Sequence, residues 1–170
     1  MLRRVWIPVL VGLLAAVLVG STAVTATEPR VTTTSVMIPA GAFIPTTDDW
    51  DYFHPGSSVA LNDGHGNFTA PVWFPVPVVN IKRITVYAYD NDAAASVCVI
   101  LLRARPAAGV EDSVGEVCTV DSASDPAASY TTVLDSRQVN TALQGPYLWA
   151  SFDGPGIELY GVKITYSYEA

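Results

Sequence analysis

Short apolar stretches separated by turn residues recur along most of the chain. Strict alternation of apolar and polar positions is typical of a strand with one buried face, and no stretch of a dozen residues keeps a helical period. Strands are therefore expected at Val36–Ile38, Phe68–Phe74, Ile81–Tyr89, Ser96–Arg103, Ser113–Val120, Tyr130–Leu134, Tyr147–Phe152 and Ile157–Tyr168.

Alternation assigns the two faces of the last expected strand. Its large side chains fall at every second position, as Tyr160, Val162, Ile164, Tyr166 and Tyr168. Successive side chains of a strand point to opposite faces, so this set is expected to face the core. In Phe68–Phe74 the same rule points Phe68, Ala70, Val72 and Phe74 inward and Trp73 outward. Pro71 lacks a ladder donor, which predicts an edge strand.

The stretch Ser96–Arg103 is apolar on both faces, which predicts a central strand covered on its outer side. About eight strands cannot all lie in one flat, half-solvated sheet, so two packed sheets are expected. The predicted fold is an all-β, two-sheet antiparallel β-sandwich of jelly-roll-like arrangement over residues 36–170, with a flexible leader over 27–35. An immunoglobulin-like arrangement is the alternative.

The first 26 residues have the pattern of a secretory signal peptide. Arg3 and Arg4 are followed by an uncharged apolar run from Val5 to Gly20 and then by small residues that end at Ala26. An uncleaved membrane anchor is the alternative, but the run is shorter than a spanning helix needs. The protein is therefore expected to be secreted or held at the cell envelope, with no membrane contact after cleavage.

Removing these 26 of 170 residues leaves 144, which suits one domain. The net charge would change from −7 to −9, because two arginines and no acid are lost. So negative a surface repels phosphate backbones and anionic headgroups. Nucleic acid is therefore not an expected partner.

The two cysteines, Cys98 and Cys118, fall in neighbouring expected strands. The segment between them has Pro106 and Gly109 at its centre, and a hairpin folded there places the cysteines opposite each other. The same register pairs Val99 with Val117 and Leu101 with Gly115 on a core face, and Ile100 with Glu116 and Leu102 with Val114 on the other face. An oxidising compartment favours a disulfide between the two, and two free thiols are the alternative.

Acidic residues cluster in three loops. The candidate calcium ligands are Asp90 and Asp92, followed by Asp48 and Asp51. Calcium prefers hard oxygen ligands, but none of these runs has the spacing of an EF-hand, and Asp is common in turns for its own hydrogen bonding. No other cofactor is expected.

Aromatic residues provide a candidate binding surface. Trp50 and Tyr52 lie in a polar loop, while Trp73, Tyr87, Tyr89, Tyr147 and Trp149 fall on the outward phase of their strands. Exposed flat rings favour an interaction site, here a glycan platform of Trp50, Tyr52, Trp73 and Trp149. The alternative is that these rings fill the core or cover the second face of a sheet.

The two histidines, His54 and His65, both lie in turn-like loops. No Gly-x-Ser-x-Gly elbow or other nucleophile signature accompanies them. Catalytic residues are therefore not assigned, and a secreted hydrolase is the least favoured interpretation.

The segments Ile84–Asp92, Val97–Arg103 and Leu159–Tyr166 resemble a pattern found in uncharacterised secreted bacterial β-sandwich proteins. The resemblance implies an exported sandwich and provides no catalytic residues. The leading hypothesis is a non-catalytic binding or structural module at the cell surface, with an extracellular glycan or cell-surface component as partner. The alternative is a carbohydrate-binding module with a Ca²⁺ site.

Overall fold

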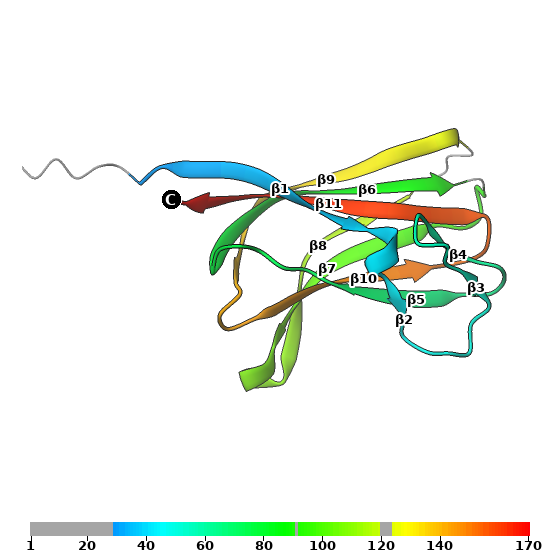
Figure 1. Cartoon of the computed structure of the whole chain (residues 1–170), viewed down its shortest axis with the longest axis horizontal. Coiled ribbons are helices and arrows are strands. Elements are labelled where there is room, and N and C mark those ends of the chain that lie inside the picture. Colours follow the sequence, from blue (N-terminus) through cyan, green and yellow to red (C-terminus); the bar gives the residue numbers. More distant parts are fainter. Residues whose placement is uncertain (1–28, 91, 120–123) are drawn as a thin grey trace, which may run out of the picture.

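Two antiparallel sheets pack face to face in the computed structural model, which describes residues 29–90, 92–119 and 124–170 (Figure 1). The expected all-β, two-sheet antiparallel sandwich is confirmed. Within the described ranges, no helix has the length and apolar character that a membrane crossing requires. The signal peptide expected over residues 1–26 lies outside these ranges.

Sheet A contains six of the described strands, in the order β3-β4-β11-β6-β9, with β1 also paired to β11. Its strands are β1 (Val31–Pro39), β3 (Tyr52–Phe53), β4 (Val59–Leu61), β6 (Val78–Asp90), β9 (Ser124–Asn140) and β11 (Ile157–Glu169). β1 and β4 pair with successive stretches along β11. Both strands therefore lie between β11 and the edge of the sheet.

Sheet B contains five strands in the order β2-β5-β10-β7-β8. Its strands are β2 (Ile44–Pro45), β5 (Gly66–Pro71), β7 (Val97–Arg105), β8 (Val110–Cys118) and β10 (Gly145–Phe152). Two 3-10 turns, η1 (Ala40–Ala42) and η2 (Pro106–Ala108), lie between strands. Only the two-residue β2 lies outside β5, so β5 is close to the edge, as Pro71 predicts.

The core lies between the sheets and follows the alternation of the sequence. Phe68, Val99 and Leu148 are fully buried from sheet B, and Ile84 and Val162 are fully buried from sheet A. Burying each large aliphatic or aromatic side chain contributes about 1.5–3 kcal/mol before conformational entropy is subtracted. The inward phase predicted for Phe68–Phe74 is therefore correct.

The β7–β8 hairpin has the predicted register over its first half. Cys98 is opposite Cys118, Val99 opposite Val117, and Leu101 opposite Gly115, and the two cysteines form a disulfide. A register shift follows Leu101, so that Leu102 pairs with Ser113 instead of the expected Val114. This irregularity is a β-bulge, in which one strand contributes an extra residue that alternation alone does not reveal.

A second bulge corrects the face predicted for Tyr160. The pairing of β11 with β6 shifts between Leu159 and Gly161, which leaves Tyr160 as an extra residue. Leu159 and Val162 are both buried, whereas Tyr160 is exposed. The inward phase thus changes from odd to even positions at Tyr160, and from Val162 to Tyr166 it follows the prediction.

The expected flexible leader over residues 27–35 is also corrected. β1 begins at Val31, and Val31 to Ser35 pair with Glu169 to Thr165 of β11. The side chains of this stretch are polar and largely exposed, so it carries little hydrophobic signal. Its order comes from backbone pairing to a long neighbouring strand, which composition does not report.

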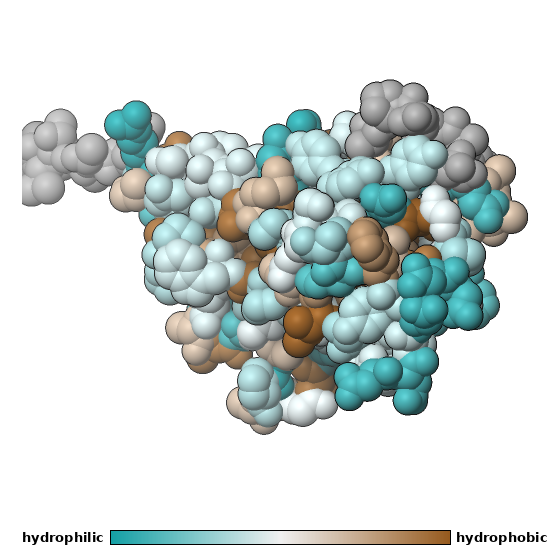
Figure 2. Space-filling view, turned by 45° about the vertical axis from the view of Figure 1, so that its right-hand side comes forward, coloured by the Kyte–Doolittle hydropathy of each residue, from teal (hydrophilic) through white to brown (hydrophobic). Residues whose placement is uncertain are grey.

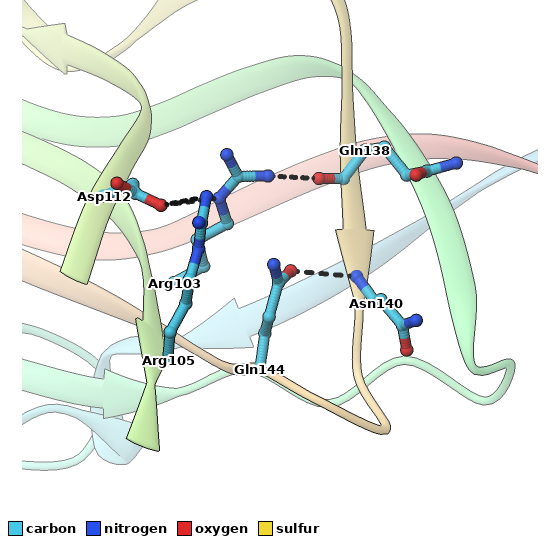
Figure 3. A network of polar contacts seen from close by, with 6 residues as sticks. All are labelled: Arg103, Arg105, Asp112, Gln138, Asn140 and Gln144. Atoms are coloured by element: carbon cyan, nitrogen blue, oxygen red, sulfur yellow. Dashed lines mark hydrogen bonds and ion pairs between the residues drawn. The ribbon is translucent and has the colours of Figure 1, made fainter. Parts of the chain in front are cut away.

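Polar contacts join the two sheets at one end of the sandwich (Figure 3). The guanidinium of Arg103 on β7 donates to the carbonyl oxygen of Gln138 on β9 and also pairs with Asp112 at 3.4 Å. Arg105 pairs with the same carboxylate at 2.5 Å. These contacts attach the far half of the β7–β8 hairpin to sheet A, beyond the apolar core.

Candidate functional site

An aromatic row lies on the outer face of sheet B. Trp149 and Tyr147 are two residues apart on β10, and both are half-buried between buried residues that face the core. Trp149 is opposite Thr69 on β5 and Ile100 on β7, so it stands in the middle of the sheet. A strand rises about 3.4 Å per residue, which separates the two rings by about 7 Å along β10.

Trp73 extends this row just beyond the end of β5. The N–H of Val72 donates to the carbonyl oxygen of Pro146 at 3.2 Å, which keeps the segment beside β10. Val72 and Phe74 are buried and Trp73 is 74% exposed, so Trp73 keeps the outward phase of β5. Trp149, Tyr147 and Trp73 are hereafter called the aromatic row.

A hydrogen bond orients Tyr147 within the row. Its hydroxyl donates to Oε2 of Glu111 on β8, so the ring edge is tied across the outer face. Burial, followed by this hydrogen bond and the negative charge of Glu111, raises the pKa of Tyr147 to about 12. The phenol therefore stays neutral and polar at physiological pH, beside an acidic acceptor.

The rest of the outer face of sheet B is polar and acidic. Glu116 on β8 is exposed and lies opposite Ile100, so two carboxylates border the row on the β8 side. Figure 1 shows the tip of the β7–β8 hairpin and the loop after β2 below sheet B, toward its opposite ends. The surface between them carries flat rings together with hydrogen-bond acceptors.

The disulfide lies on this same face, since Cys98 is opposite Ser151 on β10. Ligand atoms of Cys98, Cys118 and Glu116 lie within 4.8 Å of one another. Metals bind cysteine as thiolate, and both sulfurs are already bonded to each other. The cluster is therefore a covalent link between β7 and β8 and not a metal site.

The structure separates the four candidate glycan ligands. Trp73 and Trp149 share the outer face of sheet B. The rings of Trp50 and Tyr52 instead pack on Phe68, with centroids 6.1 Å and 5.7 Å away. Phe68 is fully buried, so these two rings cover one edge of the core.

The four candidate calcium ligands also fall in two places. Asp48 and Asp51 are exposed in the loop between β2 and β3, where Oδ1 of Asp51 accepts a hydrogen bond from Asn62 at 2.6 Å. Asp90 and Asp92 lie at the end of β6, and the backbone N–H of Asp92 donates to Oδ1 of Asp90 at 3.2 Å. Only the second pair combines neighbouring carboxylates with burial.

The histidines are not placed for a catalytic relay within the described part of the chain. Nε2 of His54 lies 3.1 Å from the carbonyl oxygen of Ala40 and donates to it. His65 is exposed in the turn before β5. Neither ring hydrogen-bonds a serine or a carboxylate of the described residues, as a Ser-His-Asp relay would require.

Sequence reasoning placed Tyr147 on the outward phase but did not include it in the site. The signal was its position two residues before Trp149, which puts both rings on one face of a strand. Glu111 was missed, because its contact with Tyr147 depends on the register after the bulge. On the face shown in Figure 2, apolar residues form small islands among polar ones.

Comparisons with known proteins bear on the fold. No protein-family model matches the chain, and no curated protein sequence matches it either. The structure is similar to the C-terminal CBM6 of LamC, a marine laminarinase from Zobellia galactanivorans, with a TM-score of 0.50 and 15% identity over 78% of this chain and 99% of that chain.

It is also similar to a structure of xylanase 10B from Clostridium thermocellum that comprises CBM22-1 and GH10 modules. The TM-score is 0.52 and the identity 10%, over 82% of this chain and 28% of that chain. The chain thus corresponds to about a quarter of that two-module structure. Both structural neighbours contain carbohydrate-binding modules, and at these identities the likeness establishes the fold alone.

Proposed function

We propose that this protein is a non-catalytic carbohydrate-binding module that acts outside the cytoplasm and holds a glycan on the outer face of sheet B. The observation that carries the proposal is the aromatic row of Trp149, Tyr147 and Trp73 along β10 and the end of β5. The fold shared with two carbohydrate-binding structures supports it.

The chemistry of the row suits a sugar. The faces of pyranose rings carry apolar C–H groups, which pack on flat aromatic rings, while sugar hydroxyls donate hydrogen bonds at the ring edges. Glu111 and Glu116 offer carboxylate acceptors beside the row, and Thr69 offers a hydroxyl. Rigid rings held by a sheet lose little conformational entropy on binding, which favours affinity at modest contact area.

Export fits this function and rests on the first 26 residues. A signal peptide would deliver the module to an oxidising compartment, and the disulfide is the kind of cross-link that persists there. Polysaccharides of cell walls and matrices lie in the same compartment. Secretion from its host, followed by detection of the processed N-terminus, tests this part separately.

Binding to soluble polysaccharides tests the glycan assignment. Laminarin, xylan and mannan are run in affinity gels, and calorimetry then measures the dissociation constant of any that retards the protein. Trp149→Ala and Trp73→Ala are each expected to weaken binding at least tenfold, because each removes a stacking ring worth about 1.4 kcal/mol or more.

Two variants serve as controls. Phe53→Ala removes a ring that is 54% exposed on β3 of sheet A and is expected to leave affinity unchanged. Trp50→Ala removes packing on Phe68 and is expected to lower the melting temperature while sparing affinity. Unchanged binding in both Trp149→Ala and Trp73→Ala, or retardation by none of the three polysaccharides, would contradict the proposal.

A further inference from the structure

Two turns pack together at the end of the sandwich where β6 leaves sheet A. One turn joins β6 to β7 and carries Asp92, and the other joins β10 to β11. A Cβ built on Gly154 would lie 3.1 Å from Cβ of Ala95, and one built on Gly156 would lie 3.6 Å from Cβ of Asp92. These close approaches hold the β6–β7 turn against the glycines of its neighbour.

Asp90 is the unusual residue at this end. It is 0% exposed, and it follows the inward phase of Val86 and Ala88 toward the space between the sheets. Its Oδ1 accepts the N–H of Asp92, but its Oδ2 is buried with no hydrogen-bond partner among the described residues. No ion pair to Asp90 or Asp92 occurs among those residues either.

A buried carboxylate oxygen without a partner is costly. Removing a charge from water costs several kcal/mol unless a counter-charge and hydrogen bonds replace the solvent. Here the nearest acidic neighbour, Asp92, adds a second negative charge two residues away, which increases the cost. A cation bound at this point removes both penalties together.

The donors favour calcium among the common cations. Every side-chain donor of this pair is a hard carboxylate oxygen, and Oδ1 of Asp92 is already occupied by the N–H of Ala94 at 2.8 Å. That leaves Oδ2 of Asp90 and Oδ2 of Asp92 as anionic ligands. Calcium accepts such oxygens together with backbone carbonyls and water in flexible geometry, whereas magnesium retains most of its water and suits a buried position poorly.

We propose that Asp90 and Asp92 form a calcium site that secures the β6–β7 turn against the β10–β11 turn. The site belongs to sheet A and does not depend on the proposed glycan binding. Calcium bound there neutralises a buried charge that the folded apo-protein otherwise carries. Its role is to stabilise this end of the sandwich.

Thermal unfolding of the EDTA-treated full chain, with and without CaCl₂, tests the site. At a calcium concentration about a hundredfold above the dissociation constant, the melting temperature is expected to rise by about 5–10 °C. Asp90→Asn keeps the shape of the side chain and removes its charge. This variant is expected to lose the calcium-dependent rise and, without calcium, to melt at or above the temperature of the unmodified protein.

Asp51→Asn is the matched control, because Asp51 is an exposed acid in another loop. It is expected to keep the full calcium response, while Asp92→Asn is expected to weaken calcium binding at least tenfold in equilibrium dialysis with ⁴⁵Ca. A melting temperature that ignores calcium in the unmodified protein, or an equal rise in Asp90→Asn, would overturn the site. A rise of the same size with MgCl₂ would overturn its assignment to calcium.

Discussion

Gly161 illustrates how a single residue decides the packing of sheet A. It lies on β11 between Tyr87 of β6 and Pro39 of β1. A Cβ built on it would lie 2.8 Å from the carbonyl oxygen of Ile38, a backbone atom that cannot rotate away. The bulge at Tyr160 and the approach of β1 therefore both depend on the absence of a side chain at this position.

Gly161→Ala is accordingly expected to lower the free energy of unfolding by about 1–3 kcal/mol, the usual cost of forcing extra atoms into a packed site. Gly145→Ala is the matched control, since no heavy atom lies within 4 Å of a Cβ built there. Its effect is expected to stay within about 0.5 kcal/mol. Chemical denaturation of both variants measures the difference, and equal stabilities would refute the role given to Gly161.

Residue-level roles were harder to predict than residue-level exposure. Outward phase identified Trp73 and Trp149 correctly, because both follow strands with clear alternation. Trp50 and Tyr52 lie in a loop with no such period, and their contact with Phe68 depends on how the loop folds over the edge of the core. Composition shows only that rings are present there.

At the scale of elements, the β7–β8 hairpin is held both by a core face and by a covalent bond. Its core face comprises Val99, Leu101 and Val117, and its outer face carries the disulfide between Cys98 and Cys118. The bond closes a loop with a sequence separation of 20. In the chain-entropy account such a closure stabilises the fold by about 3 kcal/mol, through the unfolded state.

Cys98→Ser combined with Cys118→Ser is therefore expected to lower the free energy of unfolding by about 3 kcal/mol while the β-sheet signal in circular dichroism stays unchanged. The hairpin keeps its core face, so the structure persists at lower stability. Reductant is expected to lower the denaturation midpoint of the unmodified protein and to leave the double variant unaffected. A midpoint that is insensitive to reductant in the unmodified protein would argue against a stabilising bond.

The elements that sequence patterns predicted well are those with long, regular alternation. β5, β7, β8, β10 and most of β11 fall where expected, and the cysteine register follows from a turn centred between the two residues. The two- and three-residue strands β2, β3 and β4 were not predicted, because so few residues cannot show a period. The bulges at Tyr160 and after Leu101 were missed because an inserted residue changes the phase without changing composition.

At the scale of the whole molecule, the two proposed sites lie on different layers of the sandwich. Asp90 ends β6 in sheet A, and Trp149 stands on the outer face of sheet B. Packed sheets are about 10 Å apart, and the ring of Trp149 points away from the other layer. Sites at such a separation with no shared partner usually act independently.

The double variant Asp90→Asn with Trp149→Ala is therefore expected to combine the two single effects without coupling. Its glycan affinity should equal that of Trp149→Ala, and its loss of calcium response should equal that of Asp90→Asn, with changes in unfolding free energy that add within about 0.5 kcal/mol. Calorimetry with the bound polysaccharide and calcium-dependent melting, performed on all four proteins, provide the cycle. A coupling above that limit would mean that the two sheets respond as one unit, so that calcium at the end of β6 alters the surface on which the glycan is held.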